Sequence, residues 1–174
     1  MNVIIRPITT GDEPFLWQAL YYAAHLDEED TITLAEAKND PQLIKYVAGW
    51  GRAGDMGFLA LDPHTLQPLG AAWLRLFTGP DKIGADDATP ELAIAVLPGY
   101  SGKGLGTQLL TQIVETARQT NSPDPSHPSI PALVLSVRID NPARRLYERF
   151  GFVVVGTLTN RVGTKSWVML ARLA

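Results

Sequence analysis

The segment that decides the fold is VLPGYSGKGLGTQLL, which runs from Val96 to Leu110. Three glycines at alternate positions, 102, 104 and 106, separate an apolar stretch from a leucine-rich stretch. The apolar stretch ELAIAV, residues 91–96, predicts a central strand that is covered on both faces. The apolar residues after the glycines recur at helical spacing from Leu105 to Ala117. The segment therefore predicts a buried strand, a glycine loop and the amino end of a helix.

A glycine loop that opens into a helix also predicts an anion site. The first amide groups of a helix lack intrahelical partners, and the helix dipole places about half a positive charge at this end. Glycines let a phosphate approach the backbone closely. Lys103 adds a cation, and Thr107 adds a hydroxyl within the first turn. A plain strand-to-helix turn is the alternative, but three alternate glycines with a lysine exceed what a turn needs.

Two common phosphate loops do not fit this segment. The Walker pattern requires Ser or Thr after its lysine, whereas Gly104 follows Lys103. The dinucleotide pattern G-x-G-x-x-G fails because its third glycine, Gly106, comes one position early. These two interpretations of the segment are therefore excluded.

Composition restricts the class of protein further. A chain of 174 residues with 45% apolar content predicts one domain, residues 1–174, with its own core. The absence of cysteine excludes disulfides and cysteine nucleophiles, and the three histidines lack metal-ligand spacing, so no metal is expected. A net charge of −3 argues against a nucleic-acid partner. The sequence shows no signal peptide and no apolar run of about 20 residues, which predicts a cytoplasmic protein without a membrane partner.

The hydrophobic pattern predicts a mixed α/β fold with helices packed on a sheet. A helix at 9–24 is expected to be capped by Thr10 or Asp12, and a helix at 34–50 is expected to break at Pro41. The predicted strands are residues 3–8, 57–62, 70–77, 91–96, 133–137, 152–158 and 166–173, with further helices after 105 and within 140–150. The expected order is β-α-α-β-β-β-α-β-α-β-β.

The glycine segment resembles the acyl-CoA pyrophosphate loop of the GNAT superfamily of N-acetyltransferases. That loop has the pattern [RQ]-x-x-G-x-[GA] after a strand that ends V-x-P, and Ser101 stands here at the Arg/Gln position. A second motif, DNPARRLYERFGF at 140–152, resembles the family's later motif, an Asn before a helix that carries Leu-Tyr-Glu and ends in Gly-Phe. The opening IRPITTGDEP, residues 5–14, is also similar to the family's usual opening.

This resemblance implies a mostly antiparallel central sheet with splayed fourth and fifth strands, helices on both faces, and acetyl-CoA as cosubstrate. The pantetheine arm would lie between those strands and bond the backbone of Ile94, Ala95 and Val96. The pyrophosphate would rest on amide groups of the glycine loop. The loop residues implied are Ser101, Gly102, Lys103, Gly104, Leu105, Gly106 and Thr107.

The resemblance also implies catalytic residues. Tyr147 matches the family's general acid, and a phenol with a pKa near 10 stays protonated at neutral pH; a core tyrosine is the alternative. Asn141 would bond the pantetheine arm or cap the helix that begins at Pro142, and the two roles are compatible. Glu91 is the candidate general base by position, although it begins its strand and could lie too far from the acyl carbon. Arg144 and Arg145 could meet CoA phosphates or form a solvated face.

The function implied is transfer of an acetyl group to a primary amine of a small molecule or peptide, by direct attack in a ternary complex. A non-catalytic acyl-CoA-binding sensor or partner domain on the same fold is the alternative. The acidic run Asp27–Asp30 would suit a cationic amine or be an ordinary solvated loop. Related proteins often dimerise through sheet edges, which makes a homodimer a further implication.

Overall fold

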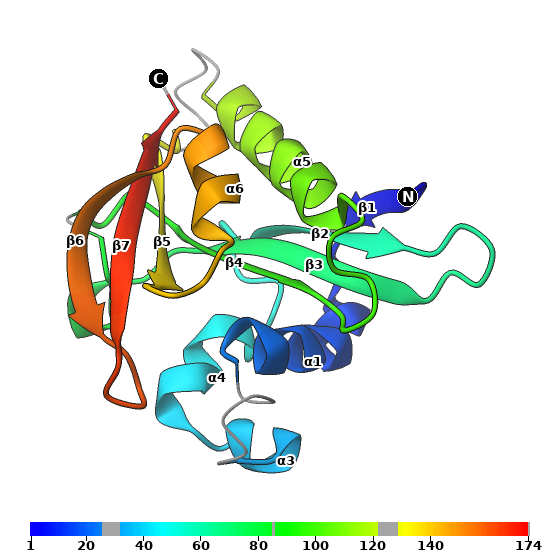
Figure 1. Cartoon of the computed structure of the whole chain (residues 1–174), viewed down its shortest axis with the longest axis horizontal. Helices are drawn as coiled ribbons and strands as arrows, with labels where there is room; N and C mark the ends of the chain where they lie inside the picture. The colour runs from blue at the N-terminus through cyan, green and yellow to red at the C-terminus, as the bar shows by residue number, and fades with distance from the viewer. Residues whose placement is uncertain (26–31, 85, 122–128, 174) are drawn as a thin grey trace. The chain divides into compact units, whose positions relative to one another are not determined.

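Strands and helices follow one another along the chain in the predicted order, except that two short helices stand where one was predicted (Figure 1). The computed structural model describes residues 1–25, 32–84, 86–121 and 129–173. The strands are β1 (Ile4–Pro7), β2 (Met56–Leu61), β3 (Pro68–Arg75), β4 (Glu91–Val96), β5 (Ala132–Arg138), β6 (Val153–Thr159) and β7 (Lys165–Arg172). The helices are α1 (Glu13–Ala23), α3 (Leu34–Ala37), α4 (Pro41–Val47), α5 (Leu105–Gln119) and α6 (Arg144–Arg149), with 3-10 turns η1 (Thr10–Asp12) and η2 (Gly79–Asp81).

The break at Pro41 is confirmed, because α3 ends before it and α4 begins on it. Proline is tolerated in the first turn of a helix, where its missing amide hydrogen would have no partner. Asp40 caps α4, since its Oδ1 accepts a hydrogen bond from the Gln42 amide at 2.9 Å. The predicted helix at 34–50 is therefore two short helices.

The strands form one mixed sheet in the order β1-β2-β3-β4-β5-β7-β6. The pairs β1–β2, β2–β3, β5–β7 and β6–β7 are antiparallel. β4 and β5 are parallel, with Glu91 opposite Val134, and α5 is the crossover helix that such a connection requires. The predicted fold class, a mostly antiparallel sheet with helices, is confirmed.

The chain packs into two compact units, Met1–Leu74 with Ala93–Ile113, and Arg75–Leu92 with Val114–Ala174. In the first unit, helices cover both faces of the sheet. Ala71 and Trp73 of β3 share a buried cluster with residues of α1 and α4. Gly70, one residue before Ala71, faces the other way, because a Cβ there would lie 3.3 Å from Leu109 Cδ1 of α5. That Cβ would also lie 2.8 Å from the Ala95 carbonyl oxygen, so glycine permits this close approach to β4.

The second unit has its own core, built on β5, β7 and α6. Leu133, Leu135 and Met169 are buried on the strands, and Phe152 is buried where α6 gives way to β6. Tyr147 of α6 meets Phe152 edge-to-face, with ring centroids 6.0 Å apart. None of the helices formed by the described residues has the length and apolar character to cross a membrane.

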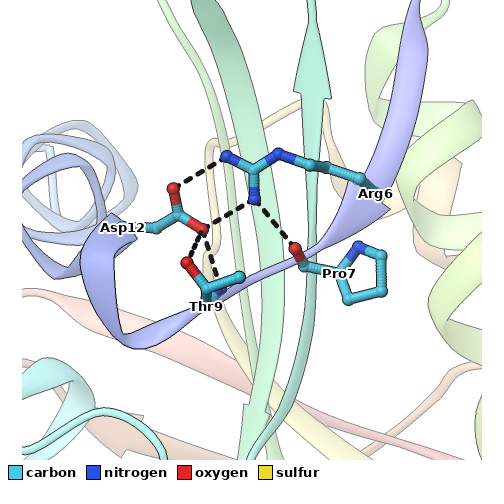
Figure 2. Close-up of polar contacts among 4 residues, drawn as sticks. All are labelled: Arg6, Pro7, Thr9 and Asp12. Atoms are coloured by element: carbon cyan, nitrogen blue, oxygen red, sulfur yellow. Dashed lines mark hydrogen bonds and ion pairs between the residues drawn. The ribbon is translucent and has the colours of Figure 1, made fainter.

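An ion pair joins β1 to the start of α1 (Figure 2). The Arg6 guanidinium donates to both Asp12 oxygens, Nη1 to Oδ2 at 2.7 Å and Nη2 to Oδ1 at 2.9 Å, and Nη1 also donates to the Pro7 carbonyl at 2.9 Å. The Thr9 amide and hydroxyl donate to Asp12 Oδ2 at 2.7 and 3.0 Å. Asp12 occupies the predicted cap position of α1, but no side-chain cap bond forms there because its carboxylate turns back to Arg6 and Thr9.

The Arg6–Asp12 pair should make stability sensitive to acid. The Arg6 hydrogen bonds hold the pKa of Asp12 at about 2, below its usual 3.8. The stabilisation is therefore complete above pH 4 and is lost as pH falls through about 2. We expect Asp12→Asn to lower the free energy of unfolding by roughly 1 kcal/mol at pH 6, and the deficit to shrink towards pH 2, in urea titrations.

The control is Asp87→Asn, which removes a more exposed ion pair to Lys82 at 2.6 Å. This control should cost less than about 0.5 kcal/mol at pH 6. A deficit in Asp12→Asn that stays constant from pH 6 to 2 would contradict the role given to its charge.

Candidate functional site

The glycine loop adopts a backbone that only glycine adopts readily. Gly102 has φ +74 and Gly104 has φ +84, both in the left-handed region. A Cβ at either position would meet nothing within 4 Å, so the space beside the loop is open on the side of both glycines. Backbone conformation, and not packing, therefore requires these glycines. The loop residues Ser101 to Gly104 are exposed.

The amino end of α5 presents amide groups that the helix itself cannot use. The Gln108 amide donates to the Gly104 carbonyl at 3.1 Å, which begins the helical ladder. The amides of Leu105, Gly106 and Thr107 precede that bond and have no intrahelical acceptor. Leu105 is 1% exposed and anchors this end in the core. The structure thus brings the predicted residues 101–107 together as an exposed turn with its amide groups available to an anion.

Positive charge is also present at the loop. The Lys103 ammonium lies 5.3 Å from the centre of the Tyr100 ring, a cation–π distance that keeps the side chain beside the loop. Thr107 is exposed in the first turn of α5, and Ser101 is exposed just before Gly102. The predicted anion site therefore has a cation and two hydroxyls in addition to its backbone donors.

Strand β4 leads directly into this loop. Beyond its end, the Leu97 amide donates to the Leu69 carbonyl at 2.8 Å, which directs the backbone of Leu97 towards the segment of β3. Backbone groups alternate along a strand, so the carbonyl of Ala95 faces β3 as well, in agreement with its approach to Gly70. Ile94 and Val96 therefore direct their backbone groups to the opposite edge. Of the three predicted residues, these two have amide and carbonyl groups directed away from β3.

In the second unit, Asn141 shapes the entry to α6. Its side-chain Oδ1 accepts a hydrogen bond from the backbone amide of Ala143 at 2.9 Å. The backbone amide of Asn141 donates to the Arg138 carbonyl at 3.0 Å. These bonds form an Asx turn between β5 and α6. The predicted helix cap at Asn141 is wrong in its detail: α6 begins at Arg144, Ala143 holds the cap position without a side-chain cap bond, and Asn141 instead forms the turn that precedes the helix.

Tyr147 is buried on α6. It is 8% exposed, and burial raises the pKa of its phenol to about 12. Among the described residues its hydroxyl forms no hydrogen bond, and the contact of its ring is the edge-to-face one with Phe152. The phenol is thus a fully protonated donor with an unused hydrogen.

Three further residues that the sequence singled out lie in the second unit. Glu91 is 6% exposed at the start of β4, so its carboxylate lies in the interior. Arg144 donates to Glu148 at 2.8 Å, and its guanidinium lies 5.3 Å from the centre of the Trp167 ring. Arg144 is therefore already engaged. Arg145 is exposed and forms no ion pair with any described residue.

The contact between Arg144 and Trp167 is one that the sequence did not predict. The i,i+4 spacing of Arg144 and Glu148 indicated their pair, but Trp167 reaches α6 only through the β5–β7 register, where it lies opposite Val137. Over the described parts of the chain, no group of three or more His, Asp or Glu residues is placed to hold a metal. The acidic run Asp27–Asp30 lies outside the described residues.

Burial of Tyr147 should appear in the alkaline stability of the protein. The folded-state pKa of about 12 exceeds the unfolded value of 10.0, so the unfolded chain loses this proton first. The contribution of the protonated Tyr147 phenol to the free energy of unfolding is therefore fully present below pH 10. It falls by roughly 1.4 kcal/mol per pH unit between pH 10 and 12. In urea titrations Tyr147→Phe should match wild type at pH 8 and be more stable by about 1 kcal/mol at pH 11.

The control for this measurement is Tyr100→Phe, which removes a phenol from a partly exposed tyrosine. It controls for the loss of a tyrosine hydroxyl as such. If the free energy of unfolding had the same slope against pH in Tyr147→Phe as in wild type between pH 8 and 11, the raised pKa of Tyr147 would be contradicted.

The comparisons with known proteins agree with this geometry. The model of the Acetyltransferase (GNAT) domain matches residues 37–154. A curated relative, the mycothiol acetyltransferase of Brachybacterium faecium, is 29% identical over 142 residues, which are 80% of this chain. The chain spans only 38% of the length of that relative.

Solved structures of low identity share the fold. An acetyltransferase of the GNAT family from Streptococcus pneumoniae aligns with a TM-score of 0.70 at 18% identity, over 99% of this chain and 100% of the other. An aminoglycoside acetyltransferase, solved with coenzyme A and kanamycin, aligns with a TM-score of 0.62 at 22% identity, over 98% and 95% of the two chains. Since the family model covers more than half of the chain and includes both the glycine loop and α6, the chain belongs to the GNAT family of acetyltransferases.

Proposed function

We propose that residues 1–174 act as one acetyltransferase domain, which transfers an acetyl group from acetyl-CoA to a primary amine of a small molecule or peptide. The observation that carries this proposal is the exposed loop at 101–107, in a chain of the GNAT family. Its left-handed glycines and the amino end of α5 form a cradle of backbone donors suited to a pyrophosphate. The relatives named for mycothiol and for aminoglycosides favour a small-molecule acceptor.

The proposed reaction is direct attack. The amine nitrogen attacks the thioester carbonyl carbon, a C–N bond forms, and the C–S bond breaks. The sulfur leaves as a thiolate and takes up one proton, while the amine nitrogen gives up one. The chain contains no cysteine to carry the acetyl group between the two substrates, which favours a ternary complex.

In this proposal each half of the cosubstrate has its own contacts. The amides of Gly102 to Thr107 and the Lys103 ammonium bind the pyrophosphate. The backbone groups of β4, above all those of Ile94 and Val96, extend the sheet by bonding the amides of the pantetheine arm. Asn141 also contributes to binding the arm, while its Oδ1 maintains the turn before α6.

Tyr147 acts as the general acid in this scheme. Its pKa of about 12 keeps the phenol protonated throughout the neutral range. An ordinary thiol has a pKa near 8.5, so the phenol is the weaker acid and serves first as a hydrogen-bond donor to the developing thiolate. Such a donor is strongest where water is excluded, and the burial of Tyr147 favours that condition.

Glu91 is the proposed base that receives the proton of the amine, directly or through water. Its burial at the start of β4 supports a role in the interior of the protein.

An acyl-CoA-binding sensor is the second candidate function. Ser101 favours it, because serine replaces the long polar side chain that is typical of this position in the loop.

Calorimetric titration with acetyl-CoA tests the shared claim of binding. Gly104→Ala should weaken binding about tenfold, because a side chain in the left-handed region costs roughly 1–2 kcal/mol and shifts the amides of the loop. Gly54→Ala is the matched control, since Gly54 also has a positive φ, +88, and open space around it, but lies outside the loop. Absence of binding to wild type at high micromolar acetyl-CoA would overturn both candidate functions.

Turnover on a panel of amines then separates the enzyme from the sensor. Tyr147→Phe should lower kcat about a hundredfold or more while the acetyl-CoA affinity stays the same, as expected for loss of a general acid. An unchanged kcat would remove Tyr147 from this role. Binding of acetyl-CoA without turnover of any amine would favour the sensor.

A further inference from the structure

A pocket at the carboxyl end of β5 carries both signs of charge. It has a volume of about 260 Å³ and is lined by Arg138, Ile139, Asp140, Thr164 and Lys165. All five residues belong to the second unit. They come from the end of β5, the segment that follows it, and the turn between β6 and β7. None of these residues was among the predicted site residues.

Hydrogen bonds hold both walls of the pocket in place. The β6–β7 turn is organised by Asn160, whose Nδ2 donates to Thr164 Oγ1 at 2.6 Å and whose Oδ1 accepts from the Thr164 amide at 3.0 Å. On the other wall, Arg138 lies opposite Ser166 in the β5–β7 register, and the Ile139 amide donates to the Lys165 carbonyl at 3.4 Å. The backbones that carry the charged side chains are therefore fixed before any ligand binds.

Two of the charged groups that line the pocket, Asp140 and Lys165, have opposite signs. Within the part of the chain that the structure describes, neither Asp140 nor Lys165 forms an ion pair, although both are exposed and line the same pocket. Thr164 Oγ1 accepts from Asn160, which leaves the hydroxyl hydrogen able to donate to a ligand. The pocket therefore offers cationic and hydroxyl donors together with one carboxylate acceptor.

This combination selects among ligands by charge. A ligand with only negative charge would leave Asp140 without a partner, and a purely cationic amine would leave Lys165 without one. A molecule with both an ammonium and a carboxylate can satisfy both signs. The volume lies just below the range of about 300–1,000 Å³ that is typical of drug-sized ligands, which suits a molecule of amino-acid size.

We propose that this pocket binds an amine acceptor that also carries a carboxylate, of the α-amino acid class. Lys165 and the Thr164 hydroxyl bind the carboxylate, and Asp140 binds the ammonium. The inference rests on the proposed acetyltransferase function and specifies its acceptor. Asp140 directly precedes Asn141, so the same turn that begins α6 carries one side of the pocket.

Paired substrates test this assignment. The panel consists of α-amino acids and the amines that result from removal of their carboxyl group, such as lysine with cadaverine. Wild type should show the lower KM for the amino acid of at least one pair. Lys165→Gln should raise that KM about three- to tenfold with kcat unchanged, and should change the KM of the decarboxylated amine less than about twofold. Asp140→Asn should raise the KM of both members.

The matched control is Arg172→Gln, which removes an exposed cation at the opposite end of β7, beside Ala132 of β5. It should leave both KM values within about twofold of wild type. A wild-type preference for the decarboxylated amines, or an equal effect of Lys165→Gln on both members of a pair, would overturn the proposal. If no amine is acetylated, calorimetric titration with the same amino acids tests whether they bind. Absence of heat at millimolar amino acid would overturn the proposal that the pocket binds them. The acetyl-CoA titration, run on the same protein, reports separately on the proposed function.

Discussion

The structure depends on one constraint, that the first amide groups of α5 have no acceptor within the helix. An exposed helix end can leave these groups to water, but here Leu105 is buried and holds the end against the core. The chain must therefore turn sharply between the end of β4 and Leu105. Gly102 and Gly104 make the turn possible through their positive φ angles. The same turn exposes the amides, so a requirement of folding and the capacity to bind an anion have a common origin.

The second constraint concerns acidity and burial at Tyr147. Burial disfavours the phenolate, which makes the phenol a poorer acid than tyrosine in water. In the proposed reaction, a buried phenol therefore contributes through a hydrogen bond to the charge that develops on sulfur. The phenol does not titrate near neutral pH, so in that proposal a pH dependence of the rate in this range would come from the amine or from its base.

The sequence predicted the helices and strands well where the apolar pattern agrees with the residues that begin or end an element, such as proline and glycine. ELAIAV is β4 residue for residue, and Pro41 begins a helix as its missing amide hydrogen requires. The sequence could not predict contacts that depend on strand register. Trp167 meets Arg144, and Lys165 shares a pocket with Asp140, only because Arg138 lies opposite Ser166 between β5 and β7. The carboxylate of Asp12 was likewise expected to cap α1, and tertiary contact with Arg6 diverted it.

Two sets of charged groups in this chain differ in how much they contribute to the stability of the fold. Arg6 and Asp12 form a two-bond pair that is reinforced by Thr9, so their charges hold β1 to the start of α1. Asp140 and Lys165 are exposed, and pairs of exposed charges contribute less than about 1 kcal/mol to stability. Because folding gains so little from them, their substitution should disturb the fold little. A change in acceptor preference after such a substitution would therefore report on recognition, whereas a change after substitution of Arg6 or Asp12 would also report on folding.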